Sequence, residues 1–290
     1  MSSLRLGLTS PIVTRLPGVA GGWEASAGIA ELADIAVAAE ELGFEYLTCS
    51  EHVAVPTGVA AQRGGTYWDP LSTFGFLAAR TRRIRFVTQV LVLGYHHPLE
   101  IAKRYGTFDT ISGGRLTLGV GVGSLREEFE LLGAEFAGRG ALADDALRAL
   151  RASLSVPEPV YEGSAYRYGG MLVEPHAVQP HVPIWVGGRS RRSLRRAVEL
   201  GDGWVPFGLG RGQLAEMLDS VSPPDDFEVV LPAGPLDPTD EQATAAVLEK
   251  TRRAGATIIG VTIRADSAGD HVDKLRRLAD LAGLKPTGER

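Results

Sequence analysis

The segment Ser112–Gly133, SGGRLTLGVGVGSLREEFELLG, holds a turn, a strand and the start of a helix in one continuous piece. It opens with glycines, continues through an apolar run at Leu116–Val122, and passes into a charged stretch of helical period. Glycines in the closing turn leave no side chains between the backbone and a flat or phosphorylated ligand. The same pattern is typical of a buried barrel strand whose glycines only ease packing, so both interpretations stay open at this point.

Short apolar runs alternate with longer amphipathic segments on both sides of that stretch. Eight strands are predicted, at Leu4–Thr9, Tyr46–Ser50, Ile84–Leu93, Leu116–Val122, Pro183–Gly187, Trp204–Phe207, Phe227–Leu231 and Thr257–Ile263. A segment of helical period follows each of them, with no polar or low-complexity linker between. An open doubly wound sheet more often stops at about five or six strands. We therefore predict an α/β fold, a single (β/α)8 TIM barrel over residues 1–290.

Three intervals are too long for simple connections. Ser10–Gly28 and Glu51–Trp68 each follow a predicted strand, so we place them as insertions on the C-terminal face, where barrel active sites lie. Their glycine and proline content allows ligand-covering loops, although ordinary surface loops share this composition. Val156–Val182 alternates aromatic residues around two glycines, which predicts a small β excursion before the fifth strand.

Composition narrows the class of ligand. The formal net charge of −5 argues against a nucleic-acid or anionic-membrane surface and favours a small-molecule substrate. The single cysteine, Cys49, cannot form an intrachain disulfide, which suits a reducing compartment. The start has no basic region followed by an apolar core, and no run of about eighteen apolar residues occurs. We expect a cytoplasmic protein with no nucleic-acid partner and no membrane span.

Polar side chains end the second and third predicted strands. His52 is the strongest candidate for proton chemistry, because a barrel gathers strand ends around one pocket and imidazole titrates near neutral pH. Its alternative is a structural hydrogen bond to a loop. Glu51 beside it points outward or orients a neighbour. Gln89 interrupts an apolar run and must find a partner in the core or on a ligand. The pair His96–His97 lacks the spacing of a metal motif, so we predict no metal site and a polar pocket rim instead.

The fifth strand ends in a second glycine turn. Gly187–Gly188 is followed by Arg189, Ser190 and a helix, so backbone N–H groups, the helix dipole and a guanidinium would together favour a phosphate. In the alternative, Ser190 only caps the helix and the following arginines form a solvated face. Motifs of P-loop, serine-hydrolase and Rossmann sites are absent from the sequence, so nucleotide hydrolysis, serine hydrolysis and standard NAD binding lose support.

With these residues in view, the chain resembles the luciferase-like monooxygenase superfamily, and within it the actinobacterial oxidoreductases that use the deazaflavin coenzyme F420. The resemblance runs from Leu4 to about Phe207 and fades beyond Gly208. Its marks are SEHV at Ser50–Val53, YWDPLST at Tyr67–Thr73, RIRFVTQVLVL at Arg83–Leu93, HPLEIAK at His97–Lys103, DTISGGRLTLGVGVG at Asp109–Gly123 with REEF after it, PIWVGGRS, and LGDGW.

The resemblance assigns roles to residues already singled out. It implies that His52 sits near the reactive face of the coenzyme ring, and that Gln89–Val90 is a non-proline cis peptide that props the ring. Gly121, Gly123 and Ser124 are expected along the ring and its polyol chain, with Glu51 in the same cofactor site. The phosphate loop is expected to comprise Val186, Gly187, Gly188, Arg189 and Ser190.

Two departures bear on the substrate. Relatives that act on sugar phosphates carry a tryptophan four residues after the histidine, where this chain has Pro56. Ser124 stands where those relatives have a glutamate and many other F420-type members a tryptophan, and a smaller residue there is expected to open the pocket.

The leading hypothesis is an F420-dependent oxidoreductase that transfers a hydride between the coenzyme and a small organic substrate. The first alternative is an FMN-dependent two-component monooxygenase, supplied with reduced flavin by a separate reductase. The second is a catalytically silent binding barrel. A homodimer is expected by analogy with the resembling group.

Overall fold

The computed structural model describes residues 4–285. Within this range nine parallel strand segments form one closed sheet: β1 (Leu6–Leu8), β2 (Tyr46–Cys49), β3 (Arg85–Thr88), β4 (Leu91–Val92), β5 (Leu116–Gly121), β8 (Ile184–Gly187), β9 (Gly203–Val205), β10 (Glu228–Leu236) and β11 (Ile258–Ile263). Strand β3 pairs with both β2 and β5, which closes the ring, and β4 continues in the same position beside β5. The predicted eight-stranded TIM barrel is therefore confirmed.

The third predicted strand differs from the expectation. Ile84–Leu93 was predicted as continuous, but the strand is interrupted between β3 and β4 at Gln89–Val90, whose peptide bond is cis. The cis bond itself is what the resemblance implied. The seventh strand is longer than predicted, since β10 runs on to Leu236 with a register shift between Pro232 and Gly234. That shift gives β10 the extra length to stay paired with β11.

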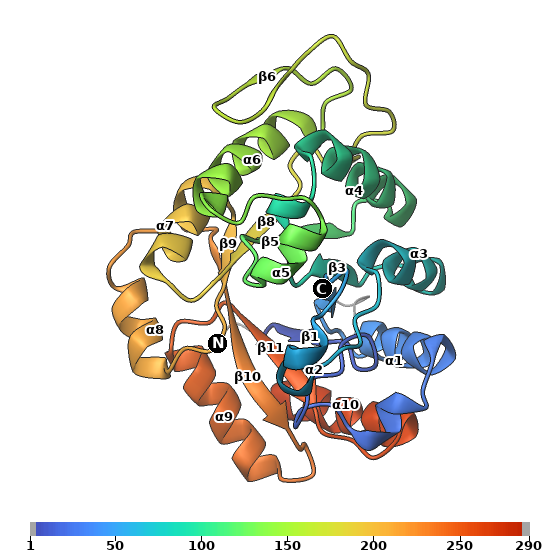
Figure 1. Cartoon of the computed structure of the whole chain (residues 1–290). Coiled ribbons are helices and arrows are strands. Elements are labelled where there is room, and N and C mark those ends of the chain that lie inside the picture. Colours follow the sequence, from blue (N-terminus) through green and yellow to red (C-terminus); the bar gives the residue numbers. More distant parts are fainter. Residues whose placement is uncertain (1–3, 286–290) are drawn as a thin grey trace.

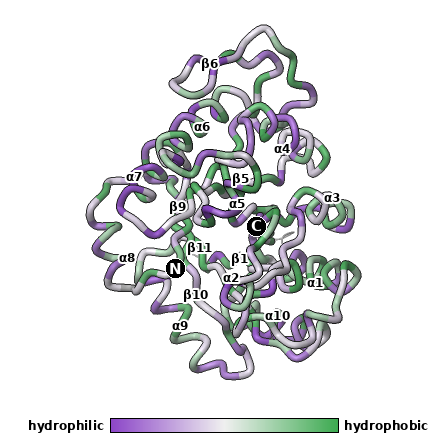
Figure 2. Tube along the Cα trace, viewed as in Figure 1, coloured by the Kyte–Doolittle hydropathy of each residue, from purple (hydrophilic) through white to green (hydrophobic). Residues whose placement is uncertain are grey.

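Helices cover the outside of the barrel (Figure 1): α1 (Ile29–Glu41), α3 (Pro70–Arg80), α4 (Pro98–Ser112), α5 (Arg126–Leu131), α6 (Arg139–Ser153), α7 (Arg191–Leu200), α8 (Arg211–Leu218), α9 (Glu241–Arg253) and α10 (Ala268–Ala282). Their ends follow local chemistry. The Asp69 carboxylate accepts from the Ser72 N–H at the start of α3, and α4 stops at Gly113 in a left-handed conformation. Figure 2 shows apolar residues along the central strands and alternating polar and apolar residues along the helices.

The long intervals acquire structure of their own. The first loop contains a short 3-10 helix, η1 (Gly22–Ala25), and the second contains α2 (Thr57–Arg63), which was not predicted. A further 3-10 turn, η2 (Leu93–Tyr95), follows β4. The predicted β excursion is confirmed as the hairpin of β6 (Tyr161–Glu162) and β7 (Arg167–Tyr168), which extends beyond α6 (Figure 1). Among residues 4–285, no helix has the length and apolar content needed to span a membrane.

Strand side chains alternate between two packing regions. One face of each strand packs on the helices, as with Leu6, Leu8 and Val186, which are almost fully buried. The other face fills the barrel interior with the cluster Tyr46, Val87, Trp185, Val205, Val230 and Ile258. Because this interior is packed, a ligand can enter only at the ends of the strands.

Candidate functional site

A cavity of about 310 Å³ lies where the carboxyl ends of the strands meet. Of the residues predicted for the site, those that line it are Glu51, His52, Gln89, Val90, Gly121, Gly123, Ser124, Gly187 and Gly188. Three others, Val186, Arg189 and Ser190, are not among its lining residues. The barrel thus brings together residues from four separate stretches of sequence, as the strand-end argument predicted.

His52 is held by a buried carboxylate. Its Nδ1 lies 2.7 Å from Oε2 of Glu128, whose side chain is fully buried. An ionised carboxylate only accepts hydrogen bonds, so Nδ1 carries the proton in this pairing and donates it. Nε2 of His52 bonds to none of residues 4–285, and His52 lines the cavity. The bond through Nδ1 agrees with the structural alternative, and the unbonded Nε2 leaves the interpretation as a proton site open.

Glu128 is the hub of this part of the site. Besides His52, its carboxylate accepts from the backbone N–H groups of Val53 at 2.6 Å and Ala54 at 3.2 Å, and from the Tyr95 hydroxyl at 2.8 Å. Burial, followed by this hydrogen bond, raises the pKa of Tyr95, which keeps its hydroxyl protonated as a donor. Four donors on one buried carboxylate fix both the chain after β2 and the imidazole plane.

Sequence reasoning missed Glu128 as a functional residue, although a signal was present. It lies three residues after Leu125 and next to Phe129, both buried, so it belongs to the apolar face of α5. Its neighbours Glu127 and Glu130 are exposed on the opposite face. A single carboxylate on the buried face of an amphipathic helix needs a partner, and that requirement points to a site.

Val90 forms the floor of the cavity between two glycines. A Cβ added at Gly121 would lie 2.7 Å from a Val90 methyl carbon, and one added at Gly187 would lie 2.9 Å from the other. The glycines at 121 and 187 therefore make room for Val90, which the cis peptide directs between β5 and β8. The Val90 side chain, flanked by two glycines without side chains, forms this part of the cavity floor.

Gly123 has a different reason to be glycine. Its φ is +77°, and an added Cβ would lie 2.5 Å from the Phe129 ring and 2.8 Å from Val92. Its carbonyl accepts from the Arg139 Nε at 3.2 Å. Close packing therefore does require glycine at these positions, as the packing alternative predicted. The same turn also lines the cavity.

Ser124 is paired across the cavity mouth. The exposed guanidinium of Arg63, the last residue of α2, donates to the Ser124 hydroxyl at 2.9 Å. The expectation that a small residue here only opens the pocket was incomplete, since Arg63 extends over the space. Tyr67, whose hydroxyl donates to the Arg63 carbonyl at 2.7 Å, packs its ring edge-on against His52 at 4.5 Å between centroids. The second loop is therefore held together internally and joined to the Gly121–Ser124 turn through Arg63.

The Gly187–Ser190 turn carries out its capping role. Ser190 accepts from the Ser193 N–H, and the Ser193 hydroxyl receives the Ser190 N–H, so the N-cap interpretation is confirmed. Arg189 lies over the Phe207 ring at 5.9 Å, at the edge of the cavity that Phe207 lines. Val186 is 1% exposed in the core beneath, so its side chain does not reach the cavity. Strand alternation turns this side chain toward the helices, so any role of Val186 in the cofactor site falls to its backbone and stays a prediction.

Glu51 orients the chain beyond the cis bond. Its carboxylate accepts from the Val92 N–H at 2.7 Å and lies 2.7 Å from Nε2 of His96. Burial lowers the pKa of His96, but the bond to Glu51 outweighs it and the pKa is raised. His97 caps α4 instead, so only Tyr95 of this trio lines the cavity. Among residues 4–285, no three His, Cys, Asp or Glu side chains converge on a point that could hold a metal ion.

Residues 6–283 match the family described as luciferase-like monooxygenase. The chain belongs to this family. The match continues through the C-terminal part, where the sequence resemblance had faded. An uncharacterized protein of Mycobacterium tuberculosis is 31% identical over 58% of this chain and 64% of its own length. An F420-dependent glucose-6-phosphate dehydrogenase of Nakamurella multipartita is 32% identical over 65% of this chain and 56% of its own length. The aligned region thus spans less than two thirds of these relatives.

Solved structures share the same barrel. A monooxygenase from Streptomyces bottropensis superposes with a TM-score of 0.71 and 20% identity, covering 95% of this chain and 98% of its own. An F420-dependent secondary alcohol dehydrogenase in complex with an F420-acetone adduct gives a TM-score of 0.75 at 12% identity, covering 97% and 99%. At these identities the likeness establishes the fold of this luciferase-like chain.

Proposed function

We propose that the protein is an oxidoreductase that uses coenzyme F420 as its hydride carrier. One observation carries the proposal: Nε2 of His52, fixed through Nδ1 by Glu128, faces a cavity whose floor is Val90 between two glycines. A flat ring on that floor would lie beside the imidazole. The coenzyme supplies hydride transfer when bound, and relatives of this chain are named for their dependence on it.

The protein's own residues supply position and a proton site. His52 holds or moves a proton at Nε2, with its tautomer set by Glu128. Glu51 accepts a hydrogen bond from the Val92 backbone N–H, and the Tyr95 hydroxyl donates to the Glu128 carboxylate that holds His52. The turns at Gly121–Ser124 and Gly187–Ser190 would border the ring and the phosphate, with Arg189 and Arg63 as the nearby cations. We assign these coenzyme-binding roles to residues of this chain by its resemblance to the family.

Equilibrium titration with F420, FMN and NADPH in parallel tests the proposal. We expect saturable F420 binding at micromolar concentration, followed by a change of coenzyme absorbance with a suitable substrate. Tight FMN binding without F420 binding would contradict it and would favour the two-component monooxygenase, as would oxygen uptake with reduced FMN. In that case a separate flavin reductase would be the partner to seek. We also expect a homodimer, which light scattering of the purified protein tests.

We do not propose a sugar phosphate as the substrate of this chain. No lysine or arginine is among the residues that line the main cavity, and Pro56 replaces the tryptophan expected for that class. A phosphate on the substrate would therefore find guanidinium groups, such as those of Arg63 and Arg189, only at the edge of the cavity among the described residues.

A further inference from the structure

A second cavity of about 220 Å³ adjoins the main one at the carboxyl ends of β1, β2 and β11. The two cavities share Thr14, Leu16, Ser50 and Gln89 as lining residues. A molecule in the second cavity would therefore lie next to the Gln89–Val90 bond that forms the floor of the first. An engineered apolar cavity of about 150 Å³ holds benzene, so this space is large enough for a ring of six atoms with one substituent.

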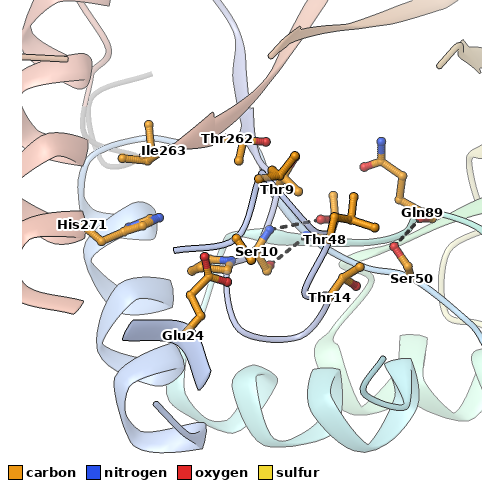
Figure 3. Close-up of a pocket in the computed structure, with 14 residues that line it drawn as sticks. Thr9, Ser10, Thr14, Glu24, Thr48, Ser50, Gln89, Thr262, Ile263 and His271 are labelled. Atoms are coloured by element: carbon orange, nitrogen blue, oxygen red, sulfur yellow. Dashed lines mark hydrogen bonds between the residues drawn. The ribbon is translucent and has the colours of Figure 1, made fainter. Parts of the chain in front are cut away.

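Two polar side chains on this cavity lack partners. Both imidazole nitrogens of His271 and the Thr14 hydroxyl bond to nothing within residues 4–285, although these atoms are buried. His271 is 1% exposed and points from α10 toward the cavity, as Figure 3 shows. Ser10 and Thr48, by contrast, exchange two hydrogen bonds, drawn as dashed lines in Figure 3. The Trp23 indole N–H, whose ring packs against His271 at 6.1 Å between centroids, is also buried without a partner among the described residues, but Trp23 does not line this cavity. Buried polar groups are almost always hydrogen-bonded, so the unpaired pair marks where a bound molecule belongs.

The imidazole is neutral at physiological pH. Burial lowers the pKa of His271 to about 4; Asp270 raises it by a smaller amount, and Lys274 lowers it further. A neutral imidazole offers one N–H donor and one acceptor nitrogen. It is therefore suited to a hydroxyl group, which both donates and accepts, or to a carbonyl oxygen.

The charges on the cavity wall oppose an ionic ligand. Apart from His271, the only titratable group among its lining residues is Glu24. The Glu24 carboxylate accepts from the backbone N–H groups of Ile12 and Gly21, each at 2.7 Å. A phosphate or carboxylate would meet this carboxylate with no lysine or arginine among the lining residues to compensate. An ammonium group would have to exchange its hydration for the one lone pair left on each Glu24 oxygen.

We propose that this cavity is the substrate subsite, and that it takes an uncharged small molecule with a hydroxyl or carbonyl group held by His271 and Thr14. The inference rests on the proposed function, since the shared wall at Gln89 is what brings such a molecule beside the coenzyme site. Thr14 comes from the first loop and His271 from the last helix. Both line one cavity because β1, which precedes the first loop, pairs with β11, which precedes the last helix.

Four probes with one ring and different charges test this at pH 7.5: cyclohexanol, cyclohexanone, cyclohexanecarboxylate and cyclohexylamine. Binding to the protein without coenzyme is followed by saturation-transfer NMR and by the imidazole ¹⁵N resonances of His271, assigned from the His271→Leu variant. We expect the alcohol and the ketone to bind and to shift those resonances. The carboxylate and the amine should bind at least about tenfold more weakly.

The variants make the outcome specific. His271→Leu and Thr14→Val should each weaken binding of cyclohexanol about fivefold, the effect of one hydrogen bond, whereas His176→Leu, outside both cavities, should not. The subsite would be overturned if the neutral probes did not bind or if the charged probes bound equally well. It would also be overturned if neither His271→Leu nor Thr14→Val weakened the binding of cyclohexanol. Thr14→Val keeps the test valid if His271→Leu does not fold. Failure of F420 titration with intact probe binding would count against the proposed function and not against this cavity.

Discussion

The two ends of the barrel are made from the same strands but use their polar residues differently. At the amino end, Arg5 pairs with Glu228 at 2.9 Å and with Glu45 at 3.4 Å. The Trp185 indole N–H also donates to Glu228, at 2.8 Å, and Arg85 donates to Thr117. These groups satisfy one another across several strands and seal that end.

At the carboxyl end, polar groups are left available. Nε2 of His52 faces a cavity, and His271 and Thr14 have no partner among residues 4–285. The groups that do pair there, such as Glu128 with His52, hold a neighbour in place and do not fill the space. The contrast separates paired residues that stabilise the fold from residues that we propose to bind ligands, and each variant below affects one end while leaving the other intact.

The largest effect is expected for His52→Ala. Loss of a positioned acid or base lowers turnover by about 100- to 10,000-fold, while the melting temperature should change little, because His52 lies at the rim and not in the core. Turnover with F420 and a neutral acceptor, followed by coenzyme absorbance, measures it. A large fall in melting temperature would instead show that His52 mainly stabilises the folded structure.

The second effect concerns acid stability and His271. The folded-state pKa is about 4 against an ordinary value of 6.5, so the unfolded chain binds this proton first as the pH falls. The free energy of unfolding should therefore be constant above about pH 6.5 and should decrease between about pH 6.5 and 4, by up to about 3 kcal/mol from this group. Urea denaturation at several pH values checks this. His271→Leu should reduce that slope, and an unchanged slope would contradict the assignment.

A third effect is expected at the sealed end. Glu228→Ala leaves the buried Trp185 N–H without its acceptor and should cost about 2 kcal/mol of unfolding free energy. Coenzyme binding and turnover should stay within about twofold of wild type, since no residue of the cavities is affected. Loss of coenzyme affinity in this variant would show that the two ends are coupled.

The smallest effect is expected for Glu128→Gln. An amide keeps the size and one acceptor oxygen, so the bonds from Val53 and Ala54 survive, while the charged partner of His52 is lost. We expect about a tenfold reduction in turnover and a changed pH profile. Glu128→Asp, which keeps the charge but shortens the side chain, is the matched control. A pH profile identical to wild type in Glu128→Gln would remove Glu128 as a positioning residue.

Much of this site follows from residues close together in sequence. The strand ends, the glycine turns and His52 follow from local periodicity, and the cis bond at Gln89–Val90 was implied by family resemblance. Glu128 was missed because its partner His52 lies 76 residues away. Arg63 was missed because α2 was taken as a loop.

The sequence by itself determined the alternation of strands and helices, the approximate place of most strands and the glycine turns, because those depend on neighbouring residues. Only the tertiary structure decided which polar groups find partners. Closure of the barrel places His271 of the last helix and Thr14 of the first loop on one cavity, and α5 brings Glu128 to His52. These pairings depend on how distant elements pack around one sheet, which no local pattern encodes.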